Sequence, residues 1–254
     1  MQEETLTPGG EVAGWPKLVV TYPTEAACVA ALLPPGLEAA GTTVTVGFYC
    51  VPVLDEPELG VSVKVPARWR GVDGHYSLGL GIDQEAAVHI SGETNGQPKF
   101  LCHVDYFRLG DVVTARASHQ GYTFVEFSGH ASGDQAALSG EVTEHEWWTK
   151  YSRAIGGQSG AYDFPPHVVD VATTFEPVWS EEVRGELVLR DSPWDPIAPL
   201  LPMVAPASAR LLNQRPTARV ITNAGPLDAD AFGPFADVIG GSRWPGERGG
   251  PRRS

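Results

Sequence analysis

Alternation of apolar and polar residues with a period of two is the strongest pattern in this sequence. It runs through 43–51, 60–65 and 75–82, where the apolar side chains of an extended chain fall on one face. Further strand-like runs, separated by turn-forming residues, lie at 112–118, 122–129, 136–143, 167–178, 183–190 and 217–223. Because many short strands at this spacing form antiparallel sheets that curl or close, we predict a mostly β fold of the α+β class.

Helical patterns are few and short. The run TEAACVAALL at 24–33 has Thr24 as a candidate N-cap, and a pair of prolines ends it. A second candidate helix at 228–239 is weakened by an internal Gly-Pro pair. The sequence therefore predicts a few short helices around a β core.

A single domain is expected from length and composition. The chain has 254 residues, of which 42% are hydrophobic, so it can bury a full core, and it contains no internal repeat and no long linker. We assign the domain to 17–239. The acidic segment 1–16 is predicted to be flexible, and the basic, Gly/Pro-rich segment 240–254 is predicted to be a disordered tail.

Charge and cysteine pattern exclude several classes of protein. A net charge of −13 disfavours nucleic acid or an anionic membrane as a partner, since both need a basic face. The N-terminal segment has no apolar run, and no stretch approaches the roughly 20 apolar residues of a membrane span. The three cysteines are odd in number and lack a CxxC spacing, which is typical of reduced thiols that fill a core. We therefore expect a cytoplasmic protein.

Familiar catalytic and metal-binding signatures are missing. The sequence has no GxGxxG, P-loop, HExxH or GxSxG motif, and its seven histidines are scattered without metal-ligand spacing. In EHEWW at 144–148, His145 lies between two glutamates, but a polar turn ahead of a buried tryptophan pair is the simpler interpretation. The sequence accordingly predicts neither a metal site nor a cofactor.

Lys99 is the residue that best fits covalent chemistry. It is one of only four lysines, and the apolar run Phe100, Leu101 and Cys102 follows it. A solvated lysine at the start of a strand would also suit an isolated GQPKF segment. An amine desolvated by apolar neighbours, however, releases its proton more readily. A free amine attacks carbonyl carbons, and the resulting Schiff base acts as an electron sink.

The order of several motifs resembles that of the acetoacetate decarboxylase family. The segment GHYSLGLGIDQEAAVHISGETNGQPKF is similar to the family's Gly-x-Tyr strand, its Asp before a short apolar segment, and its Gly-Arg-Glu followed four residues later by Pro-Lys-Lys. The matching residues are Gly74, Tyr76, Asp83, Gly92, Glu93, Pro98 and Lys99. Further blocks resemble family segments in the same order at 31–38, 109–111, 120–124 and 192–202.

The resemblance implies a closed or cone-shaped antiparallel β-barrel with outer strands and a few short helices, usually assembled as a homo-oligomer. It also implies that Lys99, at the first lysine of Pro-Lys-Lys, forms the Schiff base with a small-molecule oxo acid or a polyketide-like substrate. Activation of such a lysine by a neighbouring cation is described for acetoacetate decarboxylase itself. Here Phe100 replaces the second lysine, which leaves desolvation to activate Lys99.

Two other pocket residues of the family are absent from their expected positions. The family's pocket arginine falls at or near Trp15, which becomes a candidate substrate-binding residue. Its upstream pocket glutamate falls at Gly60 on an ungapped comparison, with Glu58 two residues away as a substitute. Glu93 is the candidate acid/base or lysine-positioning residue, unless it only caps a turn or pairs in the core.

Three further residues complete the predicted site. Gln97 and Phe100 are candidate pocket walls beside the reactive lysine. Tyr122 can either donate a hydrogen bond to a substrate carbonyl or fill the core.

The missing pocket residues bear on the reaction. Decarboxylation of a 3-oxo acid needs a pocket that places the carboxylate for loss, whereas aldol chemistry uses the same imine with a base and an electrophile site. The sequence resembles divergent family members that perform aldol condensation with dehydration, or cyclisation. We predict a Schiff-base-forming lyase that favours condensation and dehydration over decarboxylation. A true acetoacetate (3-oxo acid) decarboxylase and a non-covalent ligand-binding barrel or natural-product cyclase are the alternatives.

Overall fold

The computed structural model describes residues 15–53, 56–156 and 160–236. Its strands are β1 (Lys17–Pro23), β2 (Glu38–Ala39), β3 (Thr43–Val53), β4 (Glu56–Trp69), β5 (Val72–Ile82), β6 (Lys99–Leu101), β7 (His103–Leu109), β8 (Val112–His119), β9 (Tyr122–Ala137), β10 (Val142–Arg153), β11 (Tyr162–Leu189) and β12 (Ser208–Pro226). Its helices are α1 (Ala26–Leu32), α2 (Glu85–Asn95), α3 (Ile197–Leu200) and α4 (Ala229–Phe232), followed by the 3-10 turn η1 (Gly233–Phe235). The predicted mostly β fold is confirmed.

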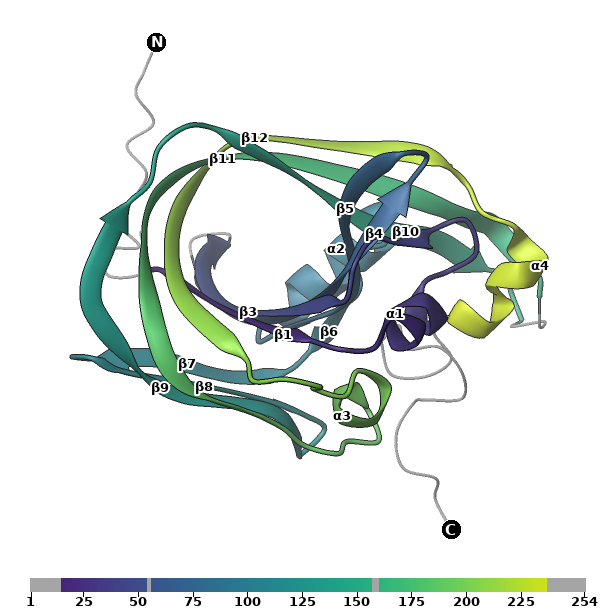
Figure 1. Cartoon of the computed structure of the whole chain (residues 1–254). Helices are drawn as coiled ribbons and strands as arrows, with labels where there is room; N and C mark the ends of the chain where they lie inside the picture. The colour runs from purple at the N-terminus through teal and green to yellow at the C-terminus, as the bar shows by residue number, and fades with distance from the viewer. Residues whose placement is uncertain (1–14, 54–55, 157–159, 237–254) are drawn as a thin grey trace.

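Seven strands form a closed circuit. In the order β10, β5, β4, β3, β1, β12 and β11, each strand hydrogen-bonds to the next, and β11 pairs in turn with β10. Figure 1 looks down the axis of this circuit and shows the long strands β11 and β12 curving around that axis. The inward side chains of these strands therefore face one another across an interior.

The expected antiparallel pairing holds for most neighbours, with two corrections. β5 runs parallel to both β10 and β6. The chain passes from β5 to β6 through α2, and a helical crossover of this kind returns the second strand parallel to the first. β11 also runs unbroken through the two runs expected at 167–178 and 183–190, because β12 pairs with it along 167–183 and β9 pairs with it along 179–189. The run expected at 136–143 is divided between the end of β9 and the start of β10.

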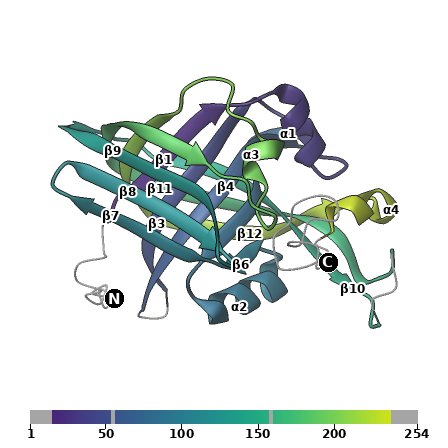
Figure 2. The same ribbon diagram turned by 90° about the horizontal axis from the view of Figure 1, so that it is seen from below.

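A second layer of strands covers one side of the circuit. β11 continues past the circuit to pair with β9, and β9, β8 and β7 form the outer part of the sheet. Figure 2 shows these three strands in front of β1 and β3. The facing sides bury one large core, whose most enclosed side chains include Phe48, Leu78 and Phe124. The apolar face of each alternating strand is therefore used for this core, which leaves the opposite face for the interior of the circuit.

The helices differ in detail from the sequence expectations. α1 begins after Glu25, which is its N-cap without a side-chain hydrogen bond, whereas Thr24 is buried one residue earlier. α4 is shorter than the predicted 228–239, and the Asp228 side chain caps it by accepting hydrogen bonds from two following backbone N–H groups. α2 is not predicted by the sequence patterns, because Ala87 is its only buried residue and a glycine interrupts it.

The segment at 144–148 is a strand, which corrects the expectation of a polar turn. It lies inside β10 and pairs with β11 along its whole length. Trp147 and Trp148 are buried, as expected. Nδ1 of His145 lies 2.9 Å from Oδ1 of Asp170 on β11. Since neighbouring residues of a strand face opposite sides, Glu146 points away from this pair.

The remaining expectations about the chain are only partly covered by the structure. All strands that the structure describes within the predicted domain 17–239 belong to one sheet, and residues 237–239 of that domain lie outside the described residues. Residues 1–14 of the predicted flexible segment and the whole of the predicted tail, 240–254, lie outside the described residues. The three cysteines are free thiols, of which Cys102 is buried and the others are half-buried. In the described part of the chain, no helix combines the length and the apolarity needed to cross a membrane.

Candidate active site

The turn after α2 delivers Lys99 to the interior. Gly96 follows the helix in the left-handed conformation (φ 68°), and an added Cβ there would lie 2.5 Å from the backbone of Lys150, so the position requires glycine. The chain then enters β6, where Lys99 is in register with Leu80 of β5. The Lys99 N–H donates to the Gln97 carbonyl at 2.7 Å. The backbone on both sides of Lys99 is therefore fixed.

Lys99 forms an ion pair with Glu58. Nζ of Lys99 lies 3.0 Å from Oε2 of Glu58, and the two side chains are only 9% and 3% exposed. Glu58 lies near the start of β4, 41 residues earlier in the sequence. Opposite charges this far removed from water attract each other more strongly than a surface pair does. The carboxylate is also within proton-transfer distance of the amine.

The place of Glu58 depends on a glycine two residues further along β4. Glu58 and Gly60 point to the same side of the strand, and Gly60 pairs with Tyr49 of β3. A Cβ added at Gly60 would lie 2.2 Å from the Tyr49 ring, so the ring occupies the space that a larger residue would need. The Tyr49 hydroxyl donates a long hydrogen bond, 3.5 Å, to Oε1 of Glu58. Burial and then the Glu58 charge raise the pKa of Tyr49 well above its ordinary value, so it keeps its proton at neutral pH.

Phe100 points away from this ion pair, which corrects the expectation that it walls the same pocket. Adjacent residues of a strand face opposite sides, and Phe100 is buried in the core with its ring centroid 4.6 Å from that of His119. His119 in turn contacts Asp195, with Nδ1 2.7 Å from Oδ2, and both side chains are buried. A lysine at position 100 would therefore not face Lys99.

Glu93 and Gln97 lie on the outer side of the lysine. The side chain of Glu93 is exposed on α2, and its backbone carbonyl accepts a hydrogen bond from Lys150. Among the described residues, Glu93 forms no hydrogen bond or ion pair with Lys99, and Glu58 holds the position beside the amine instead. Figure 2 shows α2 at the lower edge of the sheet, and the exposed side chain of Glu93 on this helix makes no ion pair with Lys99. Gln97 is half-buried and supports the Lys99 backbone; its role as a pocket wall remains a prediction.

Tyr122 and Trp15 are also placed by the structure. Tyr122 begins β9 beside the tight β8–β9 turn and is 40% exposed, so it does not fill the core. Trp15 is half-buried and packs edge-on against Tyr106 of β7, with ring centroids 6.2 Å apart. Within the described ranges neither residue has a hydrogen bond or ring contact with Lys99, and their substrate-binding roles remain predictions.

A second charged cluster lies further along the inner side of β4. Lys64 pairs with Glu146 of β10. Glu146 also accepts hydrogen bonds from the Ser77 hydroxyl and the Trp148 indole, each at 2.5 Å. Burial alone would raise the pKa of Glu146, but Lys64 and these two donors together lower it to about 2. The cluster is therefore a fixed, charged part of the interior.

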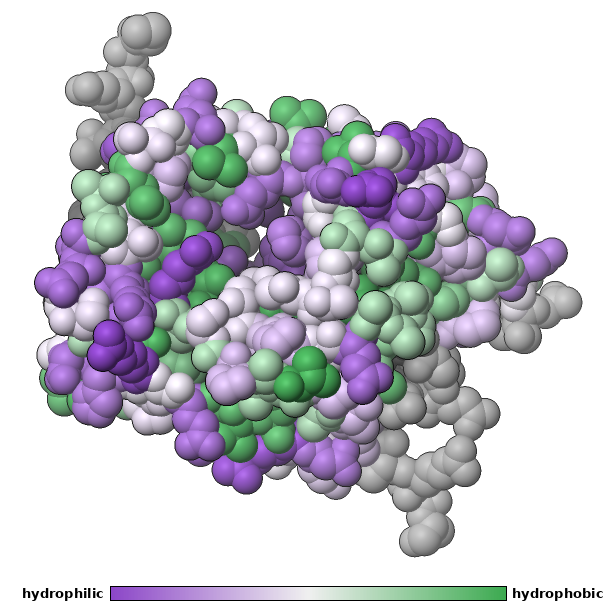
Figure 3. All heavy atoms as spheres, viewed as in Figure 1, coloured by the Kyte–Doolittle hydropathy of each residue, from purple (hydrophilic) through white to green (hydrophobic). Residues whose placement is uncertain are grey.

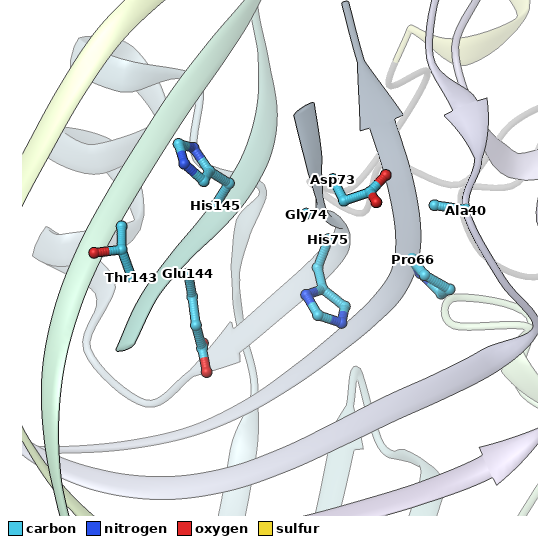
Figure 4. A pocket seen from close by; sticks show the side chains of 8 residues that line it. All are labelled: Ala40, Pro66, Asp73, Gly74, His75, Thr143, Glu144 and His145. Carbon is cyan, nitrogen blue, oxygen red and sulfur yellow. The ribbon is translucent and has the colours of Figure 1, made fainter. Parts of the chain in front are cut away.

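A hollow of about 320 Å³ lies beyond this cluster. It is lined by Ala40, Pro66, Asp73, Gly74, His75, Thr143, Glu144 and His145. Figure 3 shows that this face of the molecule is hollowed within the circuit, and Figure 4 shows His75 and Glu144 directed to one side and His145 to the other. Burial, then the charge of Lys64, lowers the pKa of His75. Pro66 is eight residues along β4 from Glu58, so this hollow and the Lys99 pair lie towards opposite ends of the strand.

Sequence reasoning did not identify Lys17, Tyr49, Lys64 or Glu146 as interior residues. The signal was present, because these residues are out of phase with the apolar face of their strands. In an open sheet such positions face water, and the closed circuit turns them inward. Three of the four lysines in the chain consequently face the interior.

Comparisons with known proteins agree on one family and one fold. The family described as acetoacetate decarboxylase (ADC) matches residues 2–222. The crystal structure of acetoacetate decarboxylase from Legionella pneumophila subsp. pneumophila str. Philadelphia 1 is similar, with a TM-score of 0.67 and 15% identity over 84% of this chain and 85% of that chain. No protein with a curated description matches the sequence.

Two other solved structures are similar to a comparable degree. The enduracididine biosynthesis enzyme MppR, complexed with pyruvate, has a TM-score of 0.63 and 15% identity over 81% of this chain and 87% of that chain. An acetoacetate decarboxylase-like enzyme from Sphingomonas wittichii RW1 has a TM-score of 0.61 and 15% identity over 87% of this chain and 98% of that chain. With sequence identities this low, the structural similarity establishes a shared fold alone.

Proposed function

The chain belongs to the acetoacetate decarboxylase family, and on that premise we propose that it is a Schiff-base-forming lyase acting on a small oxo acid. Lys99 is the amine that attacks the substrate carbonyl. The reaction favours aldol condensation with dehydration over decarboxylation. The observation that carries the proposal is the Lys99–Glu58 pair, 3.0 Å apart and almost fully removed from water.

The pair supplies the proton transfers that imine chemistry requires. Glu58 accepts a proton from the Lys99 ammonium, and the free amine adds to the carbonyl carbon; loss of water then gives the imine. Glu58, once it has passed its proton to the departing water, removes a proton from the carbon next to the imine, which gives an enamine. The enamine carbon attacks an aldehyde carbon, and the alkoxide that forms takes the proton held by Glu58. Glu58 then removes the second proton from the attacking carbon and passes it to the new hydroxyl, which leaves as water while the carbon–carbon double bond forms. Hydrolysis of the imine releases an unsaturated oxo acid and restores Lys99.

Two features of the site favour condensation over decarboxylation. The second lysine of the family motif is Phe100, which faces the core, so no adjacent cation acts on Lys99 from that position. The acid beside the amine is Glu58, and its partner Tyr49 keeps its proton, so a candidate base and a candidate proton donor lie together beside Lys99. A condensation needs these two functions in succession.

One of the structural neighbours offers a parallel. MppR was solved with pyruvate and with the condensation product of pyruvate and imidazole 4-carboxaldehyde. These ligands belong to MppR. For the present chain they support the choice of pyruvate and an aromatic aldehyde as the first substrates to test.

Reductive trapping tests the proposal. Borohydride added in the presence of pyruvate should reduce the imine and add a substrate-sized mass to the peptide that holds Lys99, and to no peptide holding Lys17 or Lys64. Lys99→Met should abolish the adduct, while Lys150→Met, a matched change at the lysine on the far side of Gly96, should retain it. An unlabelled Lys99 peptide with pyruvate, acetoacetate and several other oxo acids would overturn the Schiff-base function and favour non-covalent ligand binding.

A further inference from the structure

One row of residues in register connects Lys99 to the opposite side of the interior. Across β1, β3, β4, β5 and β6 the aligned residues are Val19, Gly47, Ser62, Leu80 and Lys99. Ser62 is thus two strands away from Lys99. Since neighbouring strands lie about 4.8 Å apart, roughly 10 Å separates the two backbones.

The amine of Lys17 and the hydroxyl of Ser62 both lie over Gly47. A Cβ added at Gly47 would lie 3.1 Å from Nζ of Lys17 and 2.9 Å from Oγ of Ser62, so a cation and a hydroxyl occupy the same space above the glycine. A side chain at position 47 would push them apart. Lys17 comes from β1 and precedes Leu18, which pairs with Phe48 of β3; the next residue of β3, Tyr49, contacts Glu58. The Lys17–Ser62 pair and the Lys99–Glu58 pair therefore share one interior.

The charges around Lys17 leave room for an anion. Lys64 is neutralised by Glu146, whereas no carboxylate of the described residues forms an ion pair with Lys17. Burial, then the charge of Lys64, lowers the pKa of Lys17 to about 8, against the opposing charges of Glu144 and Glu146 and with the further help of Arg210. These groups face Lys17 from β4, β10 and β12 and carry two positive and two negative charges, so the charge of Lys17 itself is left unbalanced. A half-buried cation without a partner gains most from an anionic ligand.

We propose that Lys17 and Ser62 form a subsite for an anionic group of the substrate, separate from the carbonyl that reacts at Lys99. The proposal rests on the proposed function in assuming that the carbonyl end of the substrate lies at Lys99. The group bound is a carboxylate several bonds removed from the carbonyl, because the carboxylate of pyruvate is attached to the carbonyl carbon and cannot reach across two strands. Leu80 lies between the two ends of the row, which suits an aliphatic spacer. The substrate class is therefore an oxo dicarboxylic acid or a similar distally charged oxo acid.

Calorimetry can measure binding at this subsite separately from imine formation, if the protein is a variant that cannot form the imine. In the Lys99→Met background, 2-oxoglutarate should bind more tightly than 2-oxobutyrate, which lacks the distal carboxylate. Adding Lys17→Met should weaken 2-oxoglutarate binding about 10- to 100-fold, since a hydrogen bond to a charged group is lost, and should leave 2-oxobutyrate unchanged. Ser62→Ala should give a smaller loss of the same kind. Lys150→Met is the control that removes a lysine elsewhere.

Proton uptake provides a second readout. With a pKa of about 8, Lys17 is half protonated at pH 8, so a bound carboxylate that restores its charge should draw about half a proton from the buffer. Titrations in two buffers of different ionisation enthalpy measure this number. Lys17→Arg, which is always charged, should keep tight binding and lose the uptake. Removal of a half-buried unpaired charge should not unfold Lys17→Met, and circular dichroism checks this.

The outcomes separate this subsite from the proposed function. Failure of 2-oxoglutarate to outbind 2-oxobutyrate, equal binding with and without Lys17→Met, or proton uptake that persists in Lys17→Arg would each overturn the subsite. None of these results depends on an imine. Failure of borohydride trapping at Lys99 would overturn the Schiff-base function while leaving the anion binding measurable.

Discussion

The Lys99 amine and the Glu58 carboxylate, 3.0 Å apart, come from β6 and β4, which are not consecutive in the sequence and lie on either side of β5 in the sheet. The pair combines a nucleophile with a base in a place that water hardly reaches. The acid stands two residues from the position that an ungapped family comparison predicts, on the same face of β4, because the Tyr49 ring fills the space above Gly60. The acid of this site is therefore displaced by two residues along β4 from the expected position, which keeps its side chain on the same face of the strand.

Glu58→Gln should slow the exchange of the methyl protons of pyruvate with solvent deuterium by roughly 10²- to 10⁴-fold, the usual contribution of a general base. Mass spectrometry of recovered pyruvate measures the exchange. Glu93→Gln is the matched control, and it should exchange at nearly the normal rate because its side chain is exposed on α2. Slow exchange in Glu93→Gln with normal exchange in Glu58→Gln would restore the acid/base role that the sequence assigned to Glu93.

Tyr49→Phe should lower the rate of condensation about tenfold, since the hydroxyl that contacts the Glu58 carboxylate is removed without a change in ring volume. The yield of unsaturated product from pyruvate and an aldehyde, followed by absorbance, measures this rate. Tyr122→Phe makes the same chemical change at an exposed position, and its rate should stay near that of the unaltered protein. Equal rates for all three proteins would remove Tyr49 from the site.

Release of carbon dioxide from acetoacetate should be weak compared with deuterium exchange into pyruvate. Exchange needs only the imine and a base, whereas decarboxylation also needs a pocket that holds the carboxylate for loss. Both rates can be measured on one preparation, and Lys99→Met should abolish both. Rapid carbon dioxide release with no exchange would identify the chain as a true 3-oxo acid decarboxylase.

Phe100→Lys should destabilise the fold rather than retune Lys99. The new ammonium would enter the core beside His119 and Phe124, where the ring of Phe100 now packs, and at least about 3 kcal/mol of unfolding free energy should be lost. Urea unfolding measures the loss, with Phe100→Leu as the milder apolar control. A stable Phe100→Lys protein with an altered pH-rate profile would mean that position 100 reaches the reacting amine after all.

The Lys64–Glu146 pair should make stability depend on pH in acid. The pKa of Glu146 is lowered from its ordinary 4.5 to about 2, so its contribution is present above pH 4.5 and is lost as pH falls towards 2. The shift corresponds to about 3 kcal/mol. Glu146→Gln should therefore be less stable at neutral pH, and its deficit should shrink in acid, whereas the exposed Glu144→Gln should behave like the unaltered protein. A deficit that stays constant from pH 7 to pH 3 would contradict the assignment.

The fold follows from the sequence to a large extent because strand formation is a local property. The period of two along 43–51 and 60–65 selects extended backbone and marks the face that joins the core. In 75–82 the pattern selects a strand, but a register shift leaves Tyr76 and Leu78 in the core and puts Leu80 in register with Lys99. The order of short motifs around Lys99 identifies the family, which the match over residues 2–222 confirms. The helix α2 escapes this reasoning because it makes few apolar contacts.

The candidate site could be identified only from the tertiary structure. The polar face of a strand shows no sequence pattern that distinguishes a buried, functional face from one exposed to solvent. Tyr49, Glu58 and Lys64 are polar residues that alternate with the apolar face of their strands. In an open sheet these polar residues would be exposed to water. Pairing of β10 with both β5 and β11 closes the circuit and turns that face inward. The sequence by itself thus determined the strands, the core face and the reactive lysine. The pairing of both β4 and β6 with β5 decided that Glu58 rather than Glu93 meets Lys99, because it brings together residues that are 41 apart in the sequence.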